Sequence, residues 1–184
     1  MKKITKIVQT LLVTYCMTII GVSISAADTP SSLDDWSIAL IGATESNLTR
    51  TGYEEGTNYQ RSSEKFASLV DVQGKVWDGM PLWQLAGRVD DTNGTGQSAD
   101  ENIEFNDKLA QKGYRISVTG TDGKEATLKS TDIARNNNYI LADAVNGNRL
   151  TEKDPAFPLV LVGRDIPPDQ YIGGVSKITL YINK

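Results

Sequence analysis

The sequence contains no histidine and a single cysteine, Cys16, among its 184 residues. Cys16 lies in a leader-like amino-terminal segment, so removal of that segment would leave a chain with neither residue. Such a chain cannot form a disulfide, a thiolate nucleophile or a metal site with cysteine or histidine ligands. A serine–histidine–aspartate triad and an imidazole general base are excluded for the same reason. The fold must therefore be stabilised by its apolar core, which a chain of this length can supply.

The amino-terminal segment has the pattern of an export signal. Three lysines precede a mostly apolar run over residues 11–24, and small residues follow up to Ala27. This order is typical of a cleaved signal peptide. The alternative is an uncleaved membrane anchor, but the run is shorter than the roughly 20 residues of a spanning helix. We expect residues 1–27 to be the signal and residues 28–184 to be one secreted or extracytoplasmic domain, at the cell surface or in the periplasm.

Cleavage also changes the charge balance. The signal carries three lysines and no acidic residue, so the mature chain has 16 basic and 23 acidic residues and a net charge of −7. An acidic domain repels phosphate backbones and anionic surfaces. We therefore expect no nucleic-acid partner, and membrane contact only through an uncleaved signal. A small anion or a cell-surface protein is the expected partner.

Hydrophobic periodicity divides the mature chain into short strands and short helices. Strands are predicted over 35–42, 66–77 with a turn at Gly74, 114–129 as a hairpin around Asp122-Gly123, 139–150 with a turn at Asn146-Gly147, 157–163 and 175–182. Helices are predicted over 82–89, 103–113 and 130–136, and the polar segment 47–64 is predicted to be mostly loop. Because the elements lack a regular βαβ rhythm, the predicted class is α+β: a mixed β-sheet scaffold with short helices.

The same periodicity and turn chemistry give three further expectations: a helix stripe, a turn and a strand alternation. The helix after Pro81 should bury one apolar stripe, formed by Leu82, Leu85, Ala86 and Val89. Asp78-Gly79 reads as a turn dipeptide. The strand from residue 66 alternates with Phe66, Ser68, Val70 and Val72 on one face.

A resemblance to a known family rests on six stretches: WSIALIG (36–42), WDGMPLWQL (77–85), ISVTGTDGK (116–124), ILADAVNGNRL (140–150), FPLVLV (157–162) and GGVSKITLYI (173–182). Their order resembles the molybdopterin-binding domain of the sulfite oxidase family, over about residues 35–182. The resemblance implies that family's scaffold and, where the site is intact, a molybdenum centre ligated by a cysteine.

The departures from the family pattern fall at the cofactor site. The segment in which the family places its cysteine, residues 51–75, contains none. The family's His-Gly-x-Pro-Leu-Arg signature reads PAFPLV here, with Pro155 at the histidine position and Val160 at the arginine position. Lys177 matches a family residue near the cofactor phosphate. The resemblance therefore implies a retained scaffold that has lost its redox centre, and fold alone carries no function across.

Four residues near strand ends are the candidate cofactor- or anion-binding site: Arg149, Arg164, Tyr171 and Lys177. Loops at strand ends commonly carry binding residues, and Lys177 comes from the family resemblance. Surface ion pairing, for example between Arg164 and Asp165, is the simpler interpretation of the arginines. No catalytic residue and no metal ligand is assigned.

Trp77 and Trp83 lie six residues apart around Asp-Gly-Met-Pro, and either form a ligand platform or build the core. A buried indole removes a large apolar area from water, and nothing in the spacing forces two rings into one pocket. Core packing is the preferred interpretation, with Trp77 as the more exposed ring.

Acidic residues suggest two further sites, and neither is favoured. The loop that contains Asp90, Asp91, Asn93, Asp100 and Glu101 offers oxygen ligands for calcium, but it lacks the EF-hand spacing, and a solvated loop is the simpler interpretation. The adjacent pairs Glu54-Glu55 and Asp34-Asp35 point apart on an extended chain, so a glycosidase pair is not expected.

The sequence thus predicts an exported, non-catalytic binding or interaction module on a sulfite-oxidase-like scaffold, with no bound cofactor. One alternative is a molybdopterin-binding redox protein, a molybdopterin-dependent oxidoreductase. The other is a calcium-stabilised surface protein.

Overall fold

The computed structural model describes residues 35–58, 67–92 and 105–182. The predicted export signal with Cys16 lies outside these residues, as do Asp34, Phe66, Asn93, Asp100, Glu101 and Ile103. No helix within the described ranges is long and apolar enough to cross a membrane.

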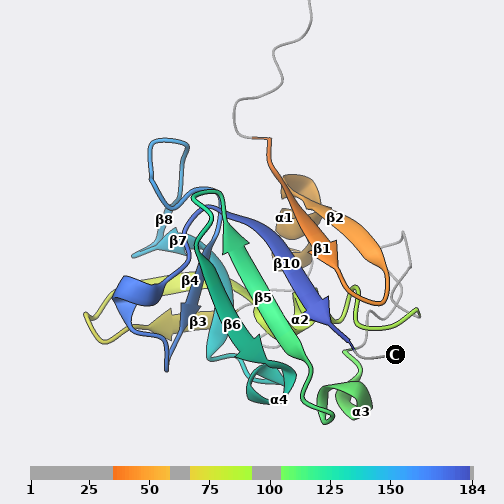
Figure 1. Ribbon diagram of the computed structural model, residues 1–184. Coiled ribbons are helices and arrows are strands. Elements are labelled where there is room, and N and C mark those ends of the chain that lie inside the picture. Colours follow the sequence, from red (N-terminus) through yellow and green to blue (C-terminus); the bar gives the residue numbers. More distant parts are fainter. Residues whose placement is uncertain (1–34, 59–66, 93–104, 183–184) are drawn as a thin grey trace, which may run out of the picture. The chain divides into compact units, whose positions relative to one another are not determined.

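The first sheet has five strands in the order β2-β1-β10-β5-β6 (Figure 1). The strands are β1 (Ser37–Ile41), β2 (Glu45–Thr49), β5 (Arg115–Gly120), β6 (Glu125–Lys129) and β10 (Val175–Tyr181). β1 and β10 are parallel, and every other neighbouring pair is antiparallel, so the sheet is mixed. The sheet pairs β1, the first strand along the chain, with β10, the last.

The second sheet has the order β3-β4-β7-β8, and β9 also pairs with β7. Its strands are β3 (Ala67–Val70), β4 (Val76–Pro81), β7 (Tyr139–Val145), β8 (Asn148–Arg149) and β9 (Val160–Gly163). The helices are α1 (Arg50–Asn58), α2 (Leu82–Ala86), α3 (Asp107–Ala110) and α4 (Ser130–Ile133), with a 3-10 turn at Pro168–Gln170. The predicted α+β class is confirmed.

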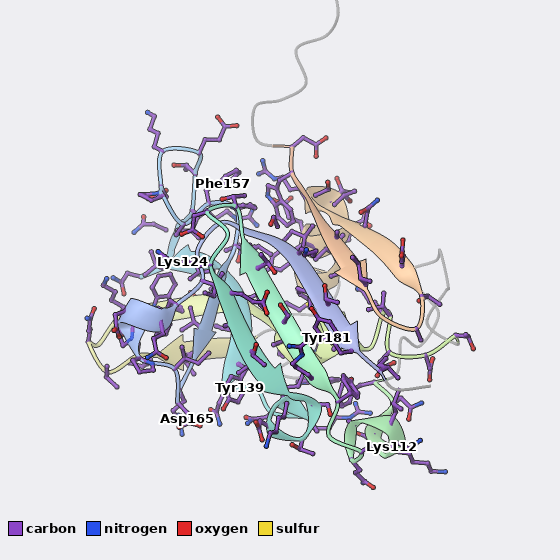
Figure 2. All side chains as sticks on the ribbon, in the orientation of Figure 1. Lys112, Lys124, Tyr139, Phe157, Asp165 and Tyr181 are labelled. Atoms are coloured by element: carbon purple, nitrogen blue, oxygen red, sulfur yellow. The ribbon has the colours of Figure 1, made fainter. Side chains whose placement is uncertain are left out.

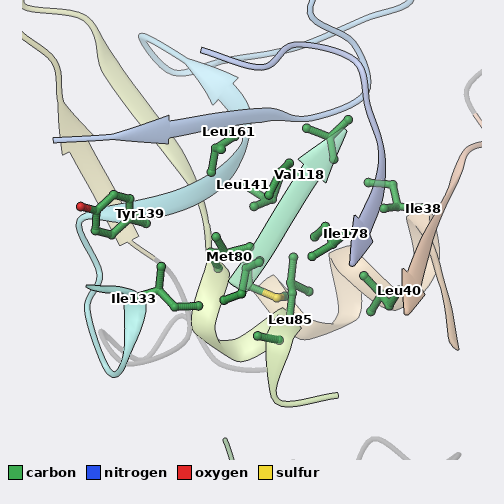
Figure 3. Close-up of a cluster of buried hydrophobic side chains, with 14 of the residues drawn as sticks. Ile38, Leu40, Met80, Leu85, Val118, Ile133, Tyr139, Leu141, Leu161 and Ile178 are labelled. Atoms are coloured by element: carbon green, nitrogen blue, oxygen red, sulfur yellow. The ribbon is translucent and has the colours of Figure 1, made fainter. Parts of the chain in front are cut away.

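The main core joins side chains from both sheets and from α2 and α4 (Figure 3). Ile38, Val118 and Ile178 come from the first sheet, and Leu141 and Leu161 from the second. A second cluster collects the residues on the other face of the second sheet: Ala67, Leu69, Trp77, Ile140, Ala142, Val160 and Val162. Because β7 and β9 are buried on both faces, their sequences are almost wholly apolar and do not alternate.

The four residues predicted to form a buried stripe after Pro81, Leu82, Leu85, Ala86 and Val89, are all fully buried. The helix predicted over 82–89 is shorter, because α2 ends at Ala86 and Val89 follows it. Two hairpin turns are also confirmed: Gly123, and the pair Asn146-Gly147, have the positive φ angles that such turns require. The helix predicted over 103–113 is a single turn within its described part, α3.

The loop predicted over 47–64 is wrong for its described part, which contains the end of β2 and all of α1. Only Leu48 and Tyr53 are buried apolar residues there. Two such residues are too few to produce a periodic signal, and α1 also contains two glycines, which disfavour helix. Tertiary packing of Tyr53 decides this segment.

The turn predicted at Asp78-Gly79 is also wrong, because both residues lie inside β4. Gly79 is required by close approach to β7, since a Cβ atom there would lie 2.1 Å from the Leu141 carbonyl oxygen. In β3 the face that carries Ser68 and Val70 is the exposed one: Leu69 is buried, whereas Val70 is 62% exposed.

Replacement of Gly79 by alanine should destabilise the domain strongly, by roughly 3 kcal/mol, because the backbone of β7 leaves no space for a methyl group. The matched control is Gly52→Ala in α1, where the nearest atom to an added Cβ would be 3.4 Å away. That change should be neutral or should stabilise the domain by roughly 0.5–1 kcal/mol. Urea unfolding of both variants measures the difference, and equal effects would contradict the close approach.

Candidate functional site

A cleft of about 200 Å³ lies where α1 meets β7, β8 and the segment that follows β8. Its walls combine aromatic and charged side chains: Trp36, Arg50, Tyr53, Glu54, Asp143, Arg149, Leu150, Thr151, Phe157 and Pro158. Phe157, labelled in Figure 2, precedes β9 and comes from a part of the chain far from α1 in sequence.

One carboxylate joins the two arginines of the cleft. The Glu54 Oε1 atom accepts hydrogen bonds from Arg50 Nε at 2.9 Å and from Arg149 Nη1 at 2.6 Å. Arg50 and Glu54 are four residues apart on α1, the spacing at which helix side chains meet. The Arg50 guanidinium, and then that of Arg149, holds the pKa of Glu54 below its usual value. Glu54 is therefore ionised at neutral pH and ties β8 to α1.

Asp143 is the acidic residue of β7, and its side chain is only 18% exposed. Burial raises the pKa of Asp143, although the charge of Arg149 opposes that shift. The nearest approach between the two groups, Arg149 Nε to Asp143 Oδ2, is 3.9 Å, which is too long for a hydrogen bond. Asp143 is thus a carboxyl group in the cleft that lies close to a cation without bonding to it.

Tyr53 forms part of the cleft wall and is fully buried. Its hydroxyl donates a hydrogen bond to the Leu141 carbonyl at 2.7 Å and accepts one from the Met80 amide at 3.2 Å. Burial raises the pKa of Tyr53 well above its usual value, so the hydroxyl stays protonated. Trp36 packs edge-on against the Tyr53 ring, with centroids 5.7 Å apart. Trp36 and Tyr53 thus form a packed aromatic pair in the wall of the cleft, next to its charged groups.

Of the four residues predicted to bind a cofactor or anion, Arg149 lines this cleft and Arg164 does not. Arg149 pairs with Ala144 near the end of β7, whereas the Arg164 amide bonds to Asn138, six residues earlier along the chain. At roughly 3.3 Å per residue, the two backbones are about 20 Å apart. The exposed Arg164 lies at the opposite end of the strand.

Tyr171 and Lys177 lie in two further places. The Tyr171 ring packs at 86° to that of Trp77, beside the second core cluster. Lys177 is an exposed residue of β10 in the first sheet, opposite Ala39 and Thr119. No hydrogen bond or ion pair joins any two of the four predicted residues, all of which are described. Their part in binding remains a prediction.

The tryptophans belong to different parts of the core, so they form no shared platform. Trp77 is 8% exposed in the second cluster, and its Nε1 donates to Asp71 at 2.9 Å. Trp83 packs at the edge of the main cluster, with the Arg135 guanidinium 4.8 Å from its ring. Core packing is confirmed, but the prediction that Trp77 is the more exposed ring is wrong, because Tyr171 covers it.

Two features of the sequence point to the cleft, although neither belonged to the predicted site. Arg50 and Glu54 have the i,i+4 spacing of a helical ion pair, which the predicted loop obscured. Asp143 is a lone acid within the apolar strand YILADAV, and a buried charge is unusual unless it has a partner. Neither signal indicates that α1 and β8 are neighbours.

The donor set does not fit a cysteine-ligated molybdenum centre. Cys16 is the only cysteine and there is no histidine. Within the described ranges, no group of three or more acidic, cysteine or histidine residues could hold a metal ion. Any pterin in the cleft would meet Arg50 and Arg149, and both arginines already bond to Glu54.

Asp90 is a second unusual carboxylate, outside the cleft and at the start of the predicted calcium loop. It is fully buried, and its Oδ2 accepts a hydrogen bond from the Asn106 amide at 2.8 Å. Its Oδ1 has no hydrogen-bond partner, and neither does the hydroxyl of Tyr114. Burial raises the pKa of Asp90 to about 6. Of the other four loop residues only Asp91, which bonds to the Asn106 side chain, is described.

Removal of the Tyr53 hydroxyl should destabilise the fold. Tyr53→Phe leaves the Met80 amide and the Leu141 carbonyl without their buried partner, which costs roughly 1–3 kcal/mol. The control is Tyr181→Phe at an exposed position of β10, where little change is expected. Chemical denaturation of both variants gives their free energies of unfolding. If Tyr53→Phe lowers the free energy of unfolding no more than the control does, the hydrogen bonds of the Tyr53 hydroxyl do not stabilise the fold.

Asp90 should make the domain less stable as the pH rises. Its folded-state pKa of about 6 lies above the usual 3.8, so the folded protein binds the proton more tightly and the stabilisation is lost between pH 4 and 7. Two pKa units correspond to roughly 3 kcal/mol. Asp90→Asn should remove this component from the stability–pH curve, whereas Asp169→Asn on the exposed surface should not. Parallel curves for wild type and Asp90→Asn would refute the assignment.

Neither a family model nor a curated protein matches this sequence. The backbone is similar to a solved structure, the sulfane dehydrogenase SoxCD from Paracoccus pantotrophus, with a TM-score of 0.50 and 15% sequence identity. The match covers 80% of this chain and 38% of that one, so the chain spans little more than a third of the neighbour's length. At this identity the likeness shows the fold alone. It is a distant relation of fold, and it agrees with the sulfite-oxidase-like scaffold expected from the sequence.

Proposed function

We propose that this protein is an exported, non-catalytic binding module on a sulfite-oxidase-like scaffold, and that the cleft between α1 and β8 holds a small polar ligand. The observation that carries the proposal is the charged network of the cleft. Glu54 bonds to both Arg50 and Arg149, beside Asp143 and the aromatic pair Trp36 and Tyr53. Such convergence of polar groups on an aromatic-lined hollow is the usual character of a small-molecule site.

The non-catalytic role is supported by the residues that the chain lacks. The family resemblance implies molybdenum held by a cysteine thiolate, and residues 51–75 contain no cysteine. The Glu54 carboxylate of the cleft also has structural partners, because it accepts hydrogen bonds from two guanidinium groups. Export is supported by the leader pattern of residues 1–27, which would place the cleft outside the cytoplasm.

A redox protein that binds molybdopterin is the second candidate, and the likeness to a sulfane dehydrogenase favours it. This chain spans 38% of that protein, so the activity of the whole protein is not carried over with the fold. The predicted contacts Arg149, Arg164, Tyr171 and Lys177 would have to act from separate surfaces of the domain.

Elemental and pterin analysis of the mature protein, purified from its native host, separates the two candidates. We expect an amino terminus at Asp28, no stoichiometric molybdenum or tungsten, and no pterin fluorescence after acid oxidation. Intact-mass measurement of the same sample checks the signal cleavage. A stoichiometric metal together with a pterin would overturn the non-catalytic role and establish the redox candidate.

A further inference from the structure

We propose that the ligand of the cleft is an uncharged, polyhydroxylated molecule of the size of one sugar ring. This inference rests on the proposed function, because it takes the cleft between α1 and β8 as the binding site. It adds the chemical class of the ligand, which follows from the charge balance, the hydrogen-bonding capacity and the size of the cleft.

Among the described residues that line the cleft, positive and negative groups are equal in number. Two guanidinium groups, Arg50 and Arg149, face two carboxyl groups, Glu54 and Asp143. An anion that approached the arginines would also meet both carboxyl groups, and a cation that approached the acids would meet both arginines. No ion of either sign is therefore concentrated here by a net field. A neutral ligand meets no such opposition.

The groups nevertheless retain hydrogen-bonding capacity of both kinds. A guanidinium has five N–H donors, and Arg149 uses Nη1 for Glu54 while its side chain stays 52% exposed. Asp143 lies 3.9 Å from Arg149, too far for a hydrogen bond, so Arg149 occupies none of its acceptor positions. Donors and acceptors thus lie side by side. A hydroxyl group donates one hydrogen bond and accepts others, so neighbouring hydroxyls can bond to Arg149 and Asp143 together.

The remaining walls supply apolar surface. Trp36, Phe157 and Pro158 are all partly exposed and line the same cleft. Ring faces of this kind bury the carbon-bound hydrogens of a sugar ring, while its hydroxyls stay at the polar edge. A volume of about 200 Å³ lies below the roughly 300–1,000 Å³ of pockets for drug-sized ligands. One ring fits such a space better than an oligomer does.

The test uses the mature chain, residues 28–184, at neutral pH. Saturation-transfer NMR and thermal shift are recorded with glucose, galactose, N-acetylglucosamine and maltose as uncharged probes. Inorganic phosphate and succinate are the charged probes. We expect at least one sugar to bind saturably and to raise the melting temperature, and neither anion to do so at the same concentrations.

Variants locate the binding. Arg149→Gln removes the exposed donor, and Asp143→Asn removes the carboxylate; each should weaken sugar binding at least tenfold. Arg164→Gln is the matched control, because Arg164 lies at the other end of β7 and should leave binding unchanged. Circular dichroism and the melting temperature verify that each variant is folded.

Each other outcome overturns a different statement. Sugar binding that survives both Arg149→Gln and Asp143→Asn would overturn the site. Binding of phosphate or succinate with silent sugars would overturn the ligand class and leave the binding module intact. Silence of every probe would overturn the ligand class too, while the metal and pterin analysis decides the proposed function by itself.

Discussion

The buried hydroxyl of Tyr53 is the interaction on which the arrangement of this domain depends most. Met80 of β4 and Leu141 of β7 are paired on neighbouring strands of the second sheet. The Tyr53 hydroxyl bonds to the backbone of both residues. The helix that carries it is short and contains two glycines, so intrinsic propensity does little to hold it. Because Arg50 and Glu54 flank Tyr53 on that helix, the same contact positions the charged wall of the cleft.

The second constraint is that β7 and β9, within the second sheet, are buried on both faces. Leu141 and Leu161 face the main core, whereas Ile140 and Val162 face the second cluster. A strand in this position has little room for a polar side chain, and Asp143 is tolerated near the end of β7, where the sheet opens into the cleft. The site therefore lies where the double burial ends, and its carboxyl group is kept partly dehydrated, which raises its pKa.

The relation to a sulfane dehydrogenase is one of scaffold. Two sheets with this strand order can carry different sites, because the residues at strand ends and in adjoining loops are not needed by the core. In this chain those positions hold an ion-pair network between α1 and β8. With the nearby Asp143 of β7, the charged groups described in the cleft are two of each sign. A network of that kind orients a neutral polar ligand better than it attracts an ion. The fold thus indicates a distant relation of scaffold, whereas the ligand depends on the residues of the cleft.

The sequence by itself determined the α+β class, most strands, the turns at Gly123 and Asn146-Gly147, and the buried residues that follow Pro81. Each of these features follows from local hydrophobic periodicity or from turn residues. The sequence also excluded histidine chemistry, and it leaves no cysteine after Cys16. The tertiary structure alone decided that residues 50–58 form a helix, that Gly79 lies inside a strand and that Arg149 meets Glu54. These features depend on contacts between segments up to 95 residues apart, and a single buried tyrosine or a close backbone approach leaves no periodic trace in the chain.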